Sequence, residues 1–178
     1  MTNQEESELL QSVIEVLCQG EVLLAGISDE AYTQKVPMAF NASVGGHYRH
    51  CLDHFRSLLN SVDSGELNYD HRERGTPVET DRGAALTVTR ELISDYENLN
   101  WSDLSLSLNV TCKTSYSSGG SQSSPSIVRR EIMYTVAHAV HHYALIGVMG
   151  EVAGLDLPEG FGVAPSTLKH QRQVAAAS

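Results

Sequence analysis

Four long segments of this chain place apolar residues at steps of three and four, and this periodicity is the feature that most constrains its fold. The pattern covers residues 5–27, 43–64, 76–99 and 124–152. Such spacing gathers the apolar side chains on one face of an α-helix, which is stable only when that face is buried. With 41% hydrophobic residues, the chain can build one shared core. We therefore predict a mainly α fold, a four-helix bundle, as a single domain over residues 1–178.

Local signals mark where these helices begin and end. Ser43 precedes the second apolar pattern as an N-cap residue would, and Gly65 follows its last turn. Thr76-Pro77-Val78-Glu79 has the form of a capping box with proline at the first helical position, which predicts the start of the third helix. Ser124-Pro125 predicts the start of the fourth helix.

The remaining segments predict shorter structures. Residues 104–116 alternate apolar and polar side chains, which is typical of a half-buried strand and indicates a small β-hairpin before the last long helix. Residues 28–42 predict a connection with one helical turn near 29–32. Pro158, Gly160 and Pro165 interrupt the tail, which predicts an irregular segment followed by one helical turn.

The charge balance excludes some classes of partner. The chain has 12 Lys and Arg against 22 Asp and Glu, a net charge of −10, so its surface repels phosphate backbones and anionic membranes. The N-terminus lacks the basic and apolar regions of an export signal, and no run of about 18 apolar residues is present. We therefore predict a cytoplasmic protein that binds neither nucleic acid nor membrane.

Histidine clustering is the strongest functional signal. Two short groups, one on the second predicted helix and one on the fourth, contain six of the eight histidines. Successive residues of an α-helix turn by about 100°, so histidines four apart share a face. The pair on the fourth helix can therefore reach one ion, and any member of the second-helix group could complete its coordination. The clusters are His47, His50 and His54, and His138, His141 and His142.

Imidazole nitrogens bind divalent transition metals, and a set of three leaves coordination positions open for water or a substrate. Because imidazole is not selective, the ion could be nickel, zinc, iron or manganese. Ala139 stands where a zinc peptidase of the H-E-x-x-H type carries its glutamate, so that class is not favoured. The alternative for such histidines is an ordinary surface or capping role.

Two segments resemble the DinB/YfiT-like family of four-helix-bundle proteins. They are Ser43-Val44-Gly45-Gly46-His47-Tyr48-Arg49-His50-Cys51-Leu52-Asp53-His54-Phe55 and His138-Ala139-Val140-His141-His142-Tyr143-Ala144-Leu145-Ile146. The resemblance implies that His50, His138 and His142 hold the metal. It places His54 one turn further along the same face, in a supporting or proton-handling role. His47 then lies at the rim. Characterised relatives include thiol-dependent S-transferases, which implies a thiol as one substrate.

Two further residues are candidates for substrate contact. Arg72, in the charged loop 69–74, could hold a substrate carboxylate if that loop lies over the metal, or it could simply be solvated. Tyr134 lies one turn from His138 and could wall an apolar pocket, although packing alone would explain it.

The functional hypothesis is a metal-dependent enzyme, a thiol-dependent S-transferase or a hydrolase, acting on a small molecule. The alternative is a non-catalytic bundle that is stabilised by a metal or binds a small molecule in a stress response, and that forms a homodimer. An exchangeable position on the metal distinguishes the first hypothesis from the second.

Overall fold

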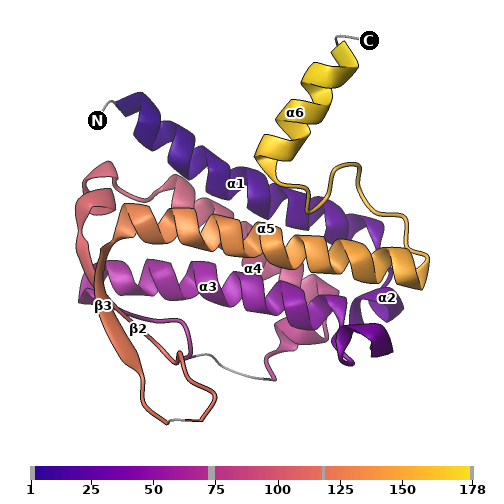
Figure 1. The fold of residues 1–178 in the computed structure, drawn as a ribbon, viewed down its shortest axis with the longest axis horizontal. Helices are drawn as coiled ribbons and strands as arrows, with labels where there is room; N and C mark the ends of the chain where they lie inside the picture. The colour runs from indigo at the N-terminus through magenta and orange to yellow at the C-terminus, as the bar shows by residue number, and fades with distance from the viewer. Residues whose placement is uncertain (1–2, 72–74, 118, 177–178) are drawn as a thin grey trace.

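The computed structural model describes residues 3–71, 75–117 and 119–176, and it is mainly helical. Four long helices form its body (Figure 1): α1 (Asn3–Gly26), α3 (Val44–Ser64), α4 (Arg82–Glu97) and α5 (Val128–Ala153). The prediction of a mainly α fold with a small β insertion is therefore confirmed.

The four helices enclose the core. α3 packs against α5 and α4, and α1 packs against α4 and α5. Most of the largest fully buried side chains lie on these four helices, and four of the whole set are tyrosines. Burying one large apolar side chain contributes about 1.5–3 kcal/mol, so this shared face is the main stabilising feature of the fold. These side chains include Leu17, Leu23, Leu24, Tyr32, Tyr48, Phe55, Leu58, Leu92, Tyr96 and Tyr143.

The ends of α3 are as predicted. The Ser43 side chain accepts a hydrogen bond from the Gly46 backbone N–H at 3.1 Å, and Gly65 ends the helix with φ of 74°. The prediction of a capping box at Thr76 is wrong. Pro77–Glu79 is a short 3-10 helix, and the Thr76 side chain makes no capping hydrogen bond. α4 starts later, where the Asp81 carboxylate accepts from the Ala84 N–H at 3.0 Å.

A three-stranded sheet covers one end of the helices. β1 (Glu66–Asn68) pairs in parallel with β2 (Ser107–Cys112), and β2 pairs antiparallel with β3 (Gln122–Ile127). The hairpin was predicted, whereas β1 was not, because three residues are too few to show alternation. Ser124-Pro125 does not start a helix: Pro125 lies in β3, opposite Asn109. β3 is an edge strand, where a residue without an N–H is tolerated.

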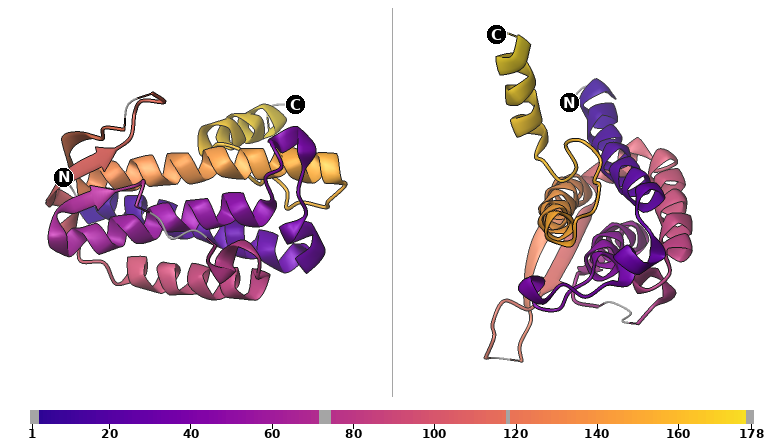
Figure 2. Two further views of the ribbon diagram at one scale, coloured as in Figure 1. Left: turned by 90° about the horizontal axis from the view of Figure 1, so that it is seen from below. Right: turned by 90° about the vertical axis from the view of Figure 1, so that its right-hand side faces the viewer.

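The connecting segments differ from the predictions mainly at the C-terminus. The turn near residue 29 is α2 (Asp29–Thr33), followed by a 3-10 turn at Pro37–Ala39. The tail folds back so that Phe161 stacks on Tyr143, with ring centroids 4.8 Å apart. It then forms α6 (Pro165–Ala176), three turns rather than the predicted single turn. α6 extends away from the four long helices (Figures 1 and 2).

One part of α1 has the length and apolar composition of a membrane-spanning helix. Within the described chain, Ser7–Gly26 is long and apolar enough to cross a bilayer, judged by length and composition alone. The core helix of a soluble protein can have the same length and composition, and Val13 and Leu17 on this segment are fully buried in the core. The prediction that the chain does not enter a membrane stays a prediction.

Candidate metal centre

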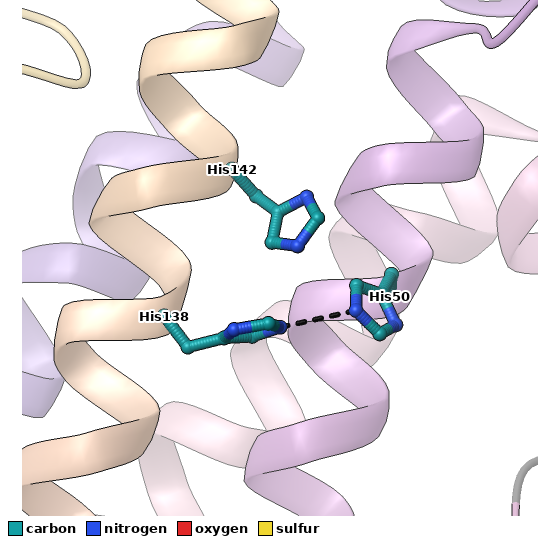
Figure 3. A group of neighbouring side chains, drawn as sticks. All are labelled: His50, His138 and His142. Carbon is teal, nitrogen blue, oxygen red and sulfur yellow. Dashed lines mark hydrogen bonds between the residues drawn. The ribbon is translucent and has the colours of Figure 1, made fainter. Parts of the chain in front are cut away.

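Three histidines from two helices converge between α3 and α5 (Figure 3). α3 carries His50, and α5 carries His138 and His142 on successive turns. One ring nitrogen from each residue lies within 4.8 Å of the corresponding nitrogen of the other two. The closest pair is His138 Nε2 and His50 Nε2, 3.0 Å apart. All three side chains are partly buried.

The nitrogen spacing fits a shared ion. Metal–imidazole bonds of about 2.0–2.1 Å place two nitrogens of a tetrahedral site about 3.3 Å apart. The pair formed by His50 and His138 is close to that spacing, and a ring nitrogen of His142 lies within 4.8 Å of both. Two imidazole nitrogens at 3.0 Å share either a proton or an ion. The cluster is therefore geometrically able to bind a metal ion.

His54 supports this cluster from the buried side. It is only 4% exposed, and its ring stacks on His138 with centroids 4.1 Å apart. The same ring meets the edge of His50 at 4.5 Å. His54 Nδ1 lies 3.0 Å from the His50 carbonyl oxygen, which only accepts, so Nδ1 carries the proton. His54 therefore limits the rotation of both neighbouring rings, and its supporting role stays a prediction.

His47 approaches the cluster from the other side. Its Nδ1 lies 2.9 Å from Nδ1 of His142. Burial, and next the positive charge that His138 and the other histidines would carry, lower the pKa of His142 to about 3. Burial, and next His141, lower the pKa of His47. Both imidazoles are therefore neutral near pH 7, which is the form that binds metal.

The two remaining candidates have different outcomes. Tyr134 is 38% exposed, and its ring stacks on that of His138 at an angle of 25° with centroids 5.7 Å apart, so it does border the cluster. Its role as a substrate contact stays a prediction. Arg72 lies outside the described residues.

Sequence analysis missed a buried polar group below the histidines. Glu131 is fully buried, and its carboxylate accepts hydrogen bonds from Tyr69 at 2.9 Å and from Ser126 and Arg130 at 2.6 Å. Burial raises the pKa of the Tyr69 phenol, which therefore remains a donor. The Tyr69 ring in turn stacks on His54 at 4.8 Å. A fixed carboxylate thus holds the ring that packs against the histidine cluster.

One signal could have revealed Glu131. It lies seven residues before His138 on α5, two helical turns along the same face. Carboxylates are rarely fully buried unless they are paired, so an acidic residue on an inward face indicates a specific partner. Tyr69 had no comparable signal, because 62 residues separate it from Glu131 in the sequence.

A cavity opens beside the N-terminal half of α3, where its histidines lie. Its volume is about 300 Å³, and His47, His50 and His142 lie on its wall together with Lys35 and Arg49. Arg49 is bound to the carboxylates of Asp53 and Glu79. Lys35 is exposed at the rim. The cavity therefore gives a small molecule access to the imidazoles past a positively charged group.

Comparison with known proteins gives one relative and no family. No family model matches the chain. No solved structure matches it either. The chain is 36% identical over 104 residues to FK506-binding protein 5 of Rhizopus delemar, a match that covers 58% of this chain and 27% of the relative. The chain thus spans about a quarter of the length of the curated relative it matches, and that protein's activity does not follow from the match.

The resemblance to the DinB/YfiT-like family is corrected by this comparison. The curated relative has the name of a different family, and no family model supports the resemblance. The segments around His50 and His138 that suggested it are short. They record the histidine spacing of two helices, which unrelated helical proteins can share. The assignment as a metalloenzyme of that family is withdrawn with it, and the metal site has to be argued from the imidazoles themselves.

Proposed function

We propose that this chain binds a divalent transition-metal ion through His50, His138 and His142, and uses it to bind and activate a small-molecule substrate. The observation that carries the proposal is the convergence of three imidazole nitrogens, each within 4.8 Å of the others, from two different helices. The proposal treats α1, α3, α4 and α5 as a four-helix bundle, whose interior is a common place for metal sites.

The donor set supports an ion that retains open positions. Three nitrogens satisfy three positions of a tetrahedral ion, and neutral imidazoles leave its double positive charge uncompensated. Such an ion would supply Lewis acidity to a bound ligand. The protein's own residues would hold the imidazoles in place, with His54 packed on His138 and His50. The cavity of about 300 Å³ beside His47 would admit the small molecule, and Lys35 at its rim favours one with a negative charge.

Metal analysis tests the ligand set. Untagged protein, loaded with nickel, zinc, iron or manganese in turn and then desalted, should retain one ion per chain of at least one of these metals. His50→Ala, His138→Ala and His142→Ala should each lose it. His141→Ala is the matched control, because His141 is exposed on the same helix and should leave the metal content unchanged. Full occupancy in His138→Ala would remove His138 from the ligand set and overturn the proposal.

A spectroscopic experiment tests the open position. Cobalt(II) in place of the native ion reports its coordination through visible absorption, and a small thiol is the first ligand to add because thiolates bind ions of this class. A thiol-dependent spectral change that is absent in His142→Ala supports substrate binding at the ion. A spectrum that no thiol, carboxylate or phosphate alters means a closed structural site, which favours a non-catalytic protein.

A further inference from the structure

The C-terminal helix α6 is a folded element without a packing surface of its own. None of the residues of Pro165–Ala176, all of which are described, is buried, and the helix extends away from the body (Figures 1 and 2). An isolated helix of 12 residues is only marginally stable in water, because nucleation is costly and few hydrogen bonds offset it. α6 therefore needs a surface to cover it.

A large groove lies where α6 diverges from α1. Its volume is about 930 Å³. α1 contributes one side with a stripe of Glu15, Cys18 and Val22, and Val22 is 54% exposed. The tail and α6 contribute the other side, which includes Phe161 and Leu168. The groove is thus an apolar strip edged by charged side chains, against which a further helix can pack.

The two helices that line the groove carry opposite charges, and the tail between them adds the acidic Glu159. α6 carries Lys169 and Arg172 and no acidic residue, although the chain as a whole has a net charge of −10. α1 has no Lys or Arg; the exposed Glu15 lines the groove, and the exposed Glu8 lies two turns before it on the same helix. A surface that complements α6 is therefore present on every copy of this chain.

We propose that a second copy of the chain inserts its α6 into this groove, and that its own groove receives the first copy's α6 in exchange. Each α6 then lies against the acidic face of the other copy's α1, so that the same contact occurs twice about a twofold axis. Closed, self-complementary contacts of this kind are the commonest form of homodimer. The exchange covers Val22 and Leu168, and it places the basic side chains of α6 beside the acidic side chains of α1. This attraction opposes the repulsion that two acidic molecules would otherwise have for one another.

A pair of charge-reversed variants tests the exchange. The first is Lys169→Glu with Arg172→Glu, and the second is Glu8→Lys with Glu15→Lys. Analytical ultracentrifugation of the full chain should show a dimer for the natural sequence and only monomer for either variant alone. An equimolar mixture of the two should dimerise again, because opposite charges then meet at both contacts. The regained dimer also demonstrates that both variants are folded.

A control variant separates this interface from a general effect of charge. Asp63→Lys with Asp95→Lys changes the net charge as much as the second variant does, but on exposed positions of α3 and α4, and it should retain the dimer. A natural chain that remains monomeric would overturn the proposal. So would variants that still dimerise alone, a control that also loses the dimer, or a mixture that stays monomeric.

Discussion

At the scale of single residues, the histidine cluster makes stability depend on pH. The pKa of His142 is about 3 in the folded chain, against 6.5 for an ordinary histidine. Between these values the unfolded chain binds a proton that the folded chain does not, so acid favours unfolding. We expect the free energy of unfolding of the metal-free protein to fall as pH decreases from about 6.5 towards 3. Urea titrations over this range should show a smaller fall for His142→Gln. An equal fall of the free energy of unfolding in both proteins would contradict the assignment of this pH dependence to His142.

The hydrogen bond from Tyr69 to Glu131 makes a second prediction at this scale. Tyr69→Phe removes one donor from a fully buried carboxylate while keeping the ring that stacks on His54. Loss of a hydrogen bond to a buried charged group costs about 1–3 kcal/mol. We therefore expect urea denaturation to show a loss of that size. Tyr116→Phe, at a fully exposed ring, should show none. A Tyr69→Phe protein as stable as this control would mean that other donors already satisfy Glu131.

The candidate site was predictable only in part. The spacing of His138 and His142 on one helix predicts that they share a face, and the structure brings them together. Helix geometry alone left His47, His50 and His54 as equal partners for them. Choosing among the three depends on how far α3 is rotated and shifted against α5, which tertiary packing decides. The Tyr69–Glu131 contact was beyond prediction for the same reason.

At the scale of elements, the sequence correctly predicted those helix ends that depend only on neighbouring residues. Ser43 caps α3 as predicted, because the hydrogen bond closes within three residues. Thr76 and Ser124 have equally suitable side chains, yet neither begins an α-helix. Ser124 lies in a strand because Val110 of β2 is available to pair with it. Such a partner is distant in sequence, so the local signal could not reveal it.

The start of α3 gives a prediction at this scale. At Gly45, a Cβ atom would lie 2.2 Å from the Glu79 carbonyl oxygen, whereas at Gly46 the nearest atom would be 3.4 Å away. Gly45→Ala should therefore push α3 away from the segment before α4 and destabilise the protein by about 1–3 kcal/mol. Gly46→Ala is the matched control, and it should raise stability by up to about 1 kcal/mol through helix propensity. Thermal denaturation compares the two, and similar midpoints would show that this close approach is relaxed in solution.

At the scale of the whole molecule, a metal ion would connect helices that belong to different parts of the chain. His50 on α3 and His138 on α5 are 88 positions apart, and α4 and the sheet are formed by the residues between them. An ion on these two helices binds the folded chain, because the unfolded chain does not hold the nitrogens together. Ligand binding to the folded state alone adds about 2.7 kcal/mol when the free ligand is at 100 times its dissociation constant.

Metal should therefore raise the unfolding temperature of the whole protein. We expect saturating metal to shift a single cooperative transition upward, by several degrees, in calorimetry of the natural chain and of His141→Ala, whose side chain is exposed and outside the three-histidine cluster. His138→Ala should unfold at one temperature with and without metal, because two imidazoles do not hold the ion tightly. If metal stabilised His138→Ala as much as the natural chain, the ion would be bound elsewhere. If it split the transition in two, α3 and α5 would unfold separately, and the ion would not be connecting them.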